Sequence, residues 1–325
     1  MTTRRQVLIG LGLSTAFLRA AFAQQTQKVY RVGFLFAGTL AQRPQAQGFW
    51  EGLRELGYIP GKNVLIEVRE AEGKLERLPQ LAQELVNSKP DVIVAVTPAA
   101  LSAAQKATAA IPIVMAIVGA SVQLGFVKNP ARPEGNITGP SMSFENLNEK
   151  RLQLFQEMLP NVKRIGLLWN ARNTSQTGIE PVEATARSLG LQVQPLLFQG
   201  PDNLESVLTT SIRGKYEALF VISDPVTFDR RASIIAFAAA HRLPSFHVFP
   251  EEAFDGGLAA YGSNLRAEYR RVAPYVARLL KGAKPADLPV EQATNFELII
   301  NMKTARLLGV TIPQSVLLRA DRVIE

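Results

Sequence analysis

Thr97, Pro98 and Ala99 form the stretch of this sequence best suited to hold a small charged ligand. They follow an apolar β-branched run and have the residue types of a helix start, because threonine is a good N-cap and proline is tolerated in the first helical turn. Ala99 leaves room for a ligand carboxylate against the free N–H groups of that helix. A plain helix cap with no ligand is the alternative interpretation of the same residues.

Asp224 and Trp169 occupy comparable places later in the chain, each at the end of an apolar run. The Asp224 carboxylate could accept a hydrogen bond from a ligand ammonium, or it could cap the helix that Pro225 begins. The Trp169 ring could stack on a ligand ring, or it could be buried between domains. The residue types leave both pairs of alternatives open.

The sequence carries weak signals for catalysis and metal binding. It contains no cysteine, and its two histidines, His241 and His247, stand at no spacing typical of a metal site. Residues 119–123 (GASVQ) lack the second glycine of a nucleophile elbow, and no phosphate-binding glycine-rich loop is present. We therefore predict no catalytic residue, no metal site and no cofactor.

Short apolar runs alternate with amphipathic segments of helical length in the first half of the chain. The runs are continuously apolar, which is typical of parallel strands in a sheet whose two faces are both covered. Gly57 is suited to close the first helix. The predicted strands are 31–36, 63–68, 91–96 and 111–117, and the predicted helices are 44–57, 75–88 and 99–110.

The second half of the chain repeats this order. Residues 29–37 read VYRVGFLFA and residues 162–170 read VKRIGLLWN, and 26 residues separate Arg31 from Gly57 just as 26 separate Arg164 from Gly190. These matches indicate duplication of a βα domain. The predicted strands are 163–169, 191–198, 217–223 and 245–249, and the predicted helices lie near 175–189, 203–214 and 228–242.

The two halves are predicted to form an α/β fold of two Rossmann-like domains with parallel sheets, joined by a three-strand hinge. Residues 119–144 are rich in Gly, Pro and Asn and provide the first crossing, while a helix at 266–281 and a strand near 296–301 require two more. The predicted first lobe comprises 28–120 and about 261–288. The predicted second lobe comprises about 121–260 and about 289–325.

Ligands of open parallel sheets bind beyond the carboxyl ends of the strands. In the first lobe this rule adds Gly38, Thr39 and Ser121 to the candidate ligand-binding residues, and in the second lobe it adds Asn170. A cleft lined from both lobes is expected at this edge.

The first 23 residues have the pattern of an export signal. Arg4 and Arg5 precede an apolar run, and Ala21-Phe22-Ala23 fits a cleavage site after Ala23. The paired arginines suit either the twin-arginine or the general secretion route. Without this segment and its three arginines the formal charge falls from +8 to +5, and the remaining charges are interleaved, which argues against a nucleic-acid partner. We expect a periplasmic, monomeric protein.

Several stretches resemble a known family. Residues 48–86 (GFWEGLRELGYIPGKNVLIEVREAEGKLERLPQLAQELV), DVIVAVTPAALSAAQKAT, NPARPEGNITG, GGLAAYG and the C-terminal run from LLKGAKPADLPVEQATNFELIINMKTARLLGV onward are similar to periplasmic substrate-binding proteins of ABC transporters, in the group with tryptophan- and tyrosine-binding members. The resemblance covers essentially the whole chain after the leader.

This resemblance implies a type I periplasmic-binding-protein fold, a small-molecule ligand enclosed by hinge closure, an inner-membrane ABC permease as partner, and no catalysis. It implies that Gly38, Thr39, Thr97 and Ala99 hold the anionic end of a ligand. It also implies that Asp224 and Phe228 contribute from the other lobe.

One segment departs from the family pattern. Relatives often carry Asp-Pro-Val after the strand that reads IPIV, whereas this chain reads Gly119-Ala120-Ser121-Val122-Gln123. An α-amino group would lose one partner, so the expected ligand is either an amino acid or an aromatic or other carboxylate compound. The alternatives to transport are an exported sensor module that presents a ligand to a membrane receptor and an exported enzyme on the same scaffold. A cytoplasmic repressor is disfavoured, because the leader stands where its DNA-binding helices would be.

Overall fold

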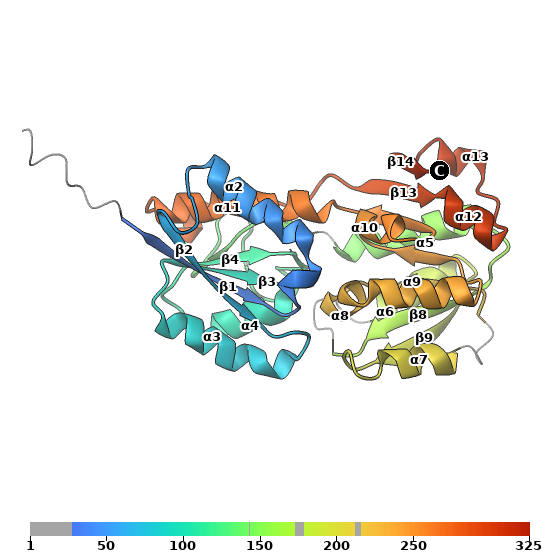
Figure 1. Ribbon diagram of the computed structural model, residues 1–325, viewed down its shortest axis with the longest axis horizontal. Coiled ribbons are helices and arrows are strands. Elements are labelled where there is room, and N and C mark those ends of the chain that lie inside the picture. The colour runs from blue at the N-terminus through green and yellow to red at the C-terminus, as the bar shows by residue number, and fades with distance from the viewer. Residues whose placement is uncertain (1–27, 143, 173–178, 212–215) are drawn as a thin grey trace, which may run out of the picture.

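The computed structural model describes residues 28–142, 144–172, 179–211 and 216–325, which form two lobes arranged side by side along the long axis (Figure 1). The predicted leader, residues 1–23, lies outside the described residues. Within the described ranges, no helix is both long enough and apolar enough to cross a bilayer.

The first lobe is built on a parallel sheet with the strand order β2-β1-β3-β4-β6. The apolar strand residues are buried because helices cover both faces: α2 and α11 pack on one face, and α3 and α4 pack on the other. The strands are β1 (Tyr30–Phe36), β2 (Val64–Glu70), β3 (Val92–Val96), β4 (Ile113–Ala116) and β6 (Ile137–Thr138). The helices are α2 (Gln47–Glu55), α3 (Leu78–Asn87), α4 (Pro98–Ala107) and α11 (Leu265–Leu280), with short 3-10 turns η1 (Leu40–Gln42), η2 (Pro44–Ala46), η3 (Leu75–Arg77) and η5 (Pro285–Asp287).

The second lobe repeats the topology and extends it. Its sheet runs β14-β13-β12-β11-β10-β8-β9, so the five strands β9-β8-β10-β11-β12 reproduce the parallel order of the first lobe, and β13 joins antiparallel to β12. The strands are β8 (Arg164–Asn170), β9 (Gln192–Phe198), β10 (Ala218–Val221), β11 (Ser245–His247), β12 (Ala259–Gly262), β13 (Glu297–Asn301) and β14 (Arg322–Ile324). The helices are α5 (Phe144–Met158), α6 (Glu180–Ser188), α7 (Leu204–Ser211), α8 (Pro225–Asp229), α9 (Arg231–Ala240), α10 (Pro250–Phe254), α12 (Met302–Leu308) and α13 (Gln314–Leu317).

The duplication predicted from the two repeated openings is confirmed by this topology. β1 and β8 occupy the same place in their sheets, next to the edge strands β2 and β9. The glycines that follow helices α2 and α6 also occupy matching places in the two lobes. Gly57 (φ 87°) donates its N–H to the Arg54 carbonyl at 3.0 Å, and Gly190 (φ 72°) donates to the Arg187 carbonyl at 3.0 Å. Both glycines therefore close a helix in the left-handed conformation that residues with a Cβ adopt reluctantly.

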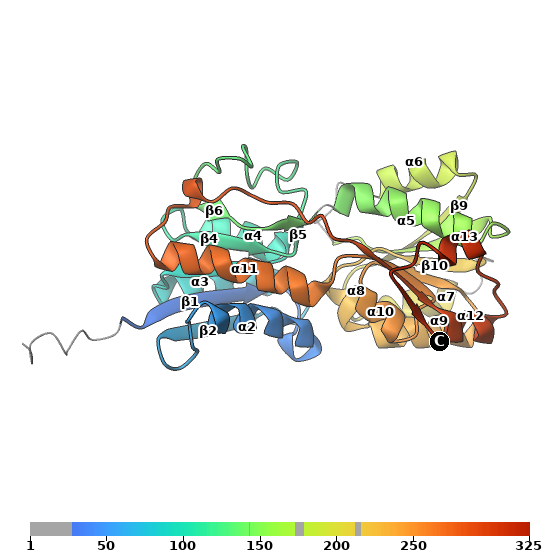
Figure 2. The same ribbon diagram turned by 90° about the horizontal axis from the view of Figure 1, so that it is seen from above.

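The sequence did not predict helix α5, nor the five-residue helix α10. α5 comes after β6 and the short strand β7 and packs on the second lobe, whereas α11 follows β12 and packs on the first, so the lobes exchange equivalent helices (Figure 2). The buried face of α5 contains Arg151, which is fully buried together with Leu152 and Phe155. A charged residue on the apolar face interrupts the hydrophobic periodicity, and this is why residues 144–158 did not stand out as a helix.

The chain crosses between the lobes three times. The first crossing lies later than the expected position at 120/121, because β6 still pairs with β4 in the first sheet. β5 (Val118–Gly119) and β7 (Ser141–Met142) pair in parallel beside this crossing. The second crossing joins β12 to α11, and the third runs from η5 to β13, as Figure 2 shows. Three connecting segments make a hinge between two separately packed lobes.

Candidate functional site

A cleft lies between the lobes at the carboxyl ends of the strands of both sheets. Residues after β1, β2, β3 and β4 form one wall, and residues after β8, β10 and β11 form the other. The lining residues are Ala37, Arg43, Gly73, Leu75, Thr97, Pro98, Ala99, Ile117, Asn170, Arg172, Ser223, Asp224, Pro225, Val226 and Phe249.

Thr97 is the most unusual residue of the first wall. Its backbone has φ 85° and ψ 154°, a region that costs a residue with a Cβ of order 1–3 kcal/mol. In contrast to the predicted N-cap, its side chain does not cap α4. The Oγ1 atom is buried and has no hydrogen-bond partner among the described residues. A buried hydroxyl without a partner costs about 1–3 kcal/mol, which makes Thr97 Oγ1 a candidate to bond a group that enters the cleft.

The N-terminus of α4 faces the same space. Pro98 occupies the first helical turn and Ala99 also lines the cleft, so the uncapped start of this ten-residue helix is directed at the cleft. Its unpaired N–H groups and its dipole favour an anion. Together with the Thr97 hydroxyl they form a donor set for a carboxylate.

A second strained residue, Ile117, lines the wall next to Thr97. It follows β4 with φ 53°, which is rare for a β-branched residue. Strained backbone at two neighbouring strand ends is typical of a binding site, because the surrounding fold must hold such residues in place. The Ile117 side chain adds apolar surface beside the polar groups of Thr97 and α4.

Asp224 and Asn170 form the polar part of the opposite wall. Asp224 Oδ1 accepts from the Thr227 N–H at 2.8 Å, while Asp224 N–H donates to Thr227 Oγ1 at 2.8 Å, completing a capping box at the start of α8. Asp224 Oδ2 accepts from Asn170 Nδ2. Burial raises the pKa of the Asp224 carboxyl, although these hydrogen bonds act in the opposite direction.

Arg43 reaches from the first lobe across to helix α8. Its Nε donates to Asp229 Oδ1 at 2.8 Å, and its Nη2 donates to the Pro225 carbonyl at 3.0 Å. The Arg43 and Asp229 side chains are only 5% and 12% exposed, so the ion pair is buried between the lobes. The Thr39 N–H also donates to Asp229, at 3.3 Å. Arg43 lines the cleft with the same side chain that joins the two lobes.

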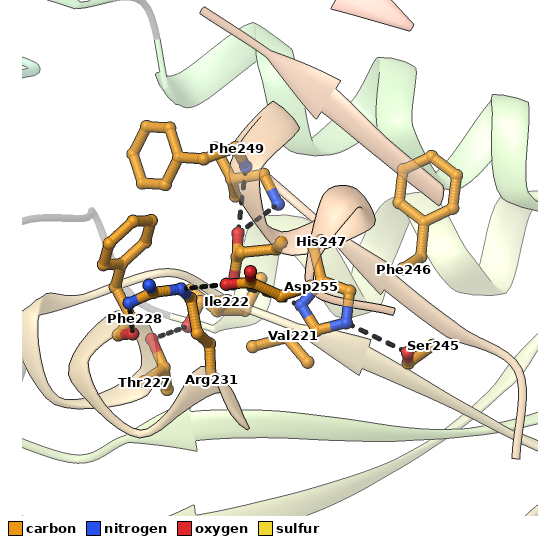
Figure 3. A network of polar contacts seen from close by, with 12 residues as sticks. Val221, Ile222, Thr227, Phe228, Arg231, Ser245, Phe246, His247, Phe249 and Asp255 are labelled. Carbon is orange, nitrogen blue, oxygen red and sulfur yellow. Dashed lines mark hydrogen bonds and ion pairs between the residues drawn. The ribbon is translucent and has the colours of Figure 1, made fainter. Parts of the chain in front are cut away.

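Phe228 and Phe249 support this contact from the second lobe. The Arg43 and Arg231 guanidinium groups lie 4.2 and 4.4 Å from the centre of the Phe228 ring, and the Phe249 ring meets it edge to face at 5.5 Å. Figure 3 shows Phe228, Arg231 and Phe249 gathered on one side of the network. Phe249 lines the cleft, whereas Phe228 is fully buried behind it.

A buried polar network holds the loop that carries Phe249. His247 Nδ1 lies 3.1 Å from Glu252 Oε1, and His247 Nε2 lies 2.9 Å from Ser245 Oγ, a contact drawn in Figure 3. Glu252 Oε2 accepts from the Phe249 N–H at 2.9 Å. Arg151 of α5 donates to the carbonyls of β10 and β11, and burial lowers its pKa to about 9. These contacts give His247 a role in shaping the wall, and within the described ranges no cluster of three or more potential metal ligands occurs.

Five of the ten ligand-binding residues predicted from the sequence line the cleft: Thr97, Pro98, Ala99, Asn170 and Asp224. The other five lie elsewhere. Thr39 donates its N–H to Asp229 across the lobe boundary, and a side chain at Gly38 would collide with Phe36 and Asp229 there. Ser121 Oγ lies 3.4 Å from Ser141 Oγ beside the first crossing. Trp169 points into the core of the second lobe, and Phe228 supports Arg43.

The cleft also contains residues that sequence reasoning missed, chiefly Arg43, Ile117, Arg172 and Phe249. Arg43 lies in the turns between β1 and α2, and an arginine in a polar loop has no local signature. The strand-end rule that selected Thr97 applies equally to Ile117 and to Phe249. Neither residue was among the candidates selected at those strand ends.

The two lobes, the shared strand order and the cleft between them define a type I periplasmic-binding-protein fold. The chain belongs to the ABC transporter substrate binding protein family, whose model matches residues 40–324. Members of this family are extracytoplasmic solute-binding proteins and not enzymes.

Three relatives are similar over most of the chain. A tyrosine-binding protein of Clostridioides difficile (strain R20291) is 26% identical over 81% of this chain and 75% of its own length. The crystal structure of a conserved domain protein from Vibrio cholerae superimposes with a TM-score of 0.85 at 28% identity, and an ABC domain from Streptococcus pneumonia in complex with L-Trp superimposes with 0.81 at 27% identity. Both structures cover 91% of this chain and 100% of their own.

Proposed function

We propose that this protein is the periplasmic solute-binding component of an ABC importer and that its lobes close on a small organic ligand, either an amino acid or an aromatic or other carboxylate compound. The observation that carries the proposal is the pair of unsatisfied donors on the first wall. The Thr97 hydroxyl and the start of α4 face Asn170 and Asp224 of the second lobe. A ligand between them touches both lobes and stabilises the closed arrangement over the open one.

The apolar lining suits the body of an organic ligand. Ile117 and Leu75 of the first lobe and Val226 and Phe249 of the second lie beside the polar groups. Clefts with mostly apolar walls and a few placed polar groups are typical of small-molecule sites. Relatives at 26–27% identity are described as tyrosine-binding or contain bound L-Trp, which supports a ligand of this size and class.

The transport role follows from family membership and from the predicted leader. A periplasmic binding protein delivers its ligand to an inner-membrane permease, and the closed lobes present the surface that such a permease recognises. We propose that the mature protein acts as a monomer, because its single chain supplies both walls of the cleft.

Binding is tested by isothermal titration calorimetry with a panel of amino acids, aromatic acids and aliphatic acids. Thr97→Val removes the hydroxyl while keeping the side-chain shape, and it should weaken binding about tenfold or more, the equivalent of one lost hydrogen bond. Thr138→Val is the matched control, because Thr138 Oγ1 bonds the Leu288 carbonyl inside the first lobe, away from the cleft. No binding to any panel member, or equal loss in both variants, contradicts the proposal.

A further inference from the structure

The charged groups that face the cleft include both signs. Among the described lining residues, Arg43 and Arg172 are cationic and Asp224 is the one anionic residue. The start of α4 adds the positive end of a helix dipole to the same side. Asp229 neutralises Arg43, so Arg172 balances Asp224 and the remaining positive potential comes from the helix dipole at the start of α4, which favours a negatively charged group there.

The acids near the cleft are already engaged by the protein. Asp224 receives the Thr227 N–H on one oxygen and the Asn170 amide on the other. Asp229 receives Arg43 on one oxygen and the Thr39 N–H on the other. The stretch 119–123 that follows Ile117 reads GASVQ and adds no acid. Every oxygen of these two carboxylates therefore already accepts a hydrogen bond from the protein, and a ligand ammonium could bind Asp224 only by sharing an oxygen with one of these donors.

The donors, in contrast, have capacity left. Thr97 Oγ1 has no partner among the described residues, and the first turn of α4 has no side-chain cap. Arg43 uses Nε and Nη2 for Asp229 and Pro225, and neither contact involves its Nη1 group. The Thr97 hydroxyl can donate or accept, but the N–H groups of α4 and the Arg43 guanidinium can only donate. Most of the available hydrogen-bonding capacity therefore suits a carboxylate and not an ammonium.

We infer that the ligand is a carboxylic acid without an α-ammonium group, with its carboxylate on Thr97 and the start of α4. Its hydrocarbon or aromatic body lies against Ile117, Val226 and Phe249. This inference rests on the proposed function and narrows its ligand class. It sets this chain apart from relatives described as binding tyrosine or tryptophan.

The test uses ligand pairs that differ only in the ammonium group, measured by calorimetry on the full mature protein. The pairs are 3-phenylpropionate and L-phenylalanine, indole-3-propionate and L-tryptophan, 3-(4-hydroxyphenyl)propionate and L-tyrosine, and 4-methylpentanoate and L-leucine. In the pair that binds most tightly, the acid should bind at least tenfold more tightly than the amino acid. The neutral amide of that acid should bind at least tenfold more weakly than the acid.

The outcomes separate the inference from the proposed function. If an amino acid binds as tightly as its matched acid, or if acid and amide bind equally, the inference is overturned while the binding function stands. If neither these pairs nor the wider panel bind, the proposed function fails with it. Thr97→Val must also weaken binding of the acid, and an unchanged affinity would overturn the placement of the carboxylate.

Discussion

The Arg43–Asp229 ion pair gives the sharpest prediction about closure, because its two members belong to different lobes. Arg43 lies in the turns after β1, and Asp229 ends helix α8, whose first residue follows the cleft-lining Asp224. When the lobes separate, the pair must break and both side chains become solvated. Asp229→Asn removes the charge and keeps the size of the side chain, so it weakens the closed state selectively.

The size of the effect follows from the geometry. Asp229 accepts a charge-assisted bond from Arg43 at 2.8 Å and a backbone bond at 3.3 Å, and both partners are almost fully buried. A hydrogen bond to a charged group contributes about 1.5–3 kcal/mol, against about 0.5–1.5 kcal/mol for a neutral bond. Asparagine retains part of the bonding, so the closed state should lose about 2 kcal/mol, which corresponds to roughly thirtyfold weaker ligand binding.

Calorimetry with the tightest-binding compound of the panel measures this loss directly. Asp255→Asn is the matched control: Asp255 pairs with Arg231 at 2.5 Å (Figure 3), but both residues belong to the second lobe, and the Asp255 side chain is 42% exposed. This control should change the affinity less than threefold, in line with the small contribution of exposed ion pairs.

Wild-type affinity in Asp229→Asn would refute the reasoning, because a pair that forms only on closure must contribute to binding. Equal losses in Asp229→Asn and Asp255→Asn would also refute it. In that case the effect would come from general destabilisation of the second lobe.

Two further predictions concern single residues of the walls. Thr97→Gly should raise the melting temperature, because glycine adopts the positive φ at this position without the backbone strain of about 1 kcal/mol that threonine carries. It should also weaken ligand binding, because the hydroxyl is lost. A variant that is less stable than wild type, or that binds as well as wild type, contradicts this account. Glu251→Gln should change the pH dependence of stability, because burial, together with Glu252 and Glu297 and against Arg231, raises the pKa of Glu251 to about 7. The folded state then binds a proton more tightly than the unfolded state, so wild type loses stability as pH rises from about 4.5 to 7. In denaturant titrations the variant should therefore be more stable than wild type by up to about 3 kcal/mol at pH 8, and the two should be similarly stable at pH 4.5.

The strands and most helices were predictable from the sequence because their physical signals are local. Parallel strands buried on both faces are continuously apolar, and β3 and β4 are buried at every position. The duplication added an independent check, since Gly57 and Gly190 close equivalent helices. The strand-end rule then led to Thr97 and Asp224 without any knowledge of the tertiary structure.

The rest of the site depends on contacts between residues far apart in the chain. Arg43 becomes part of the cleft only because Asp229, 186 positions later, draws its side chain across the lobe boundary. Helix α5 was missed because Arg151 interrupts its apolar face, and the carbonyls that satisfy Arg151 belong to β10 and β11. Trp169 was a fair candidate by position, but its side chain points to the core side of β8. Neither the partner of a buried charge nor the face of a strand-end residue can be read from local sequence.

The central claim is that the lobes close on a carboxylate held by Thr97 and the start of α4. A crystal structure of the protein with the tightest-binding compound of the panel tests it most directly. The account predicts one molecule in the cleft, with a carboxylate oxygen within hydrogen-bond distance of Thr97 Oγ1 and with Arg43 paired to Asp229. A ligand bound through an ammonium on Asp224, with its carboxylate away from Thr97, would contradict it.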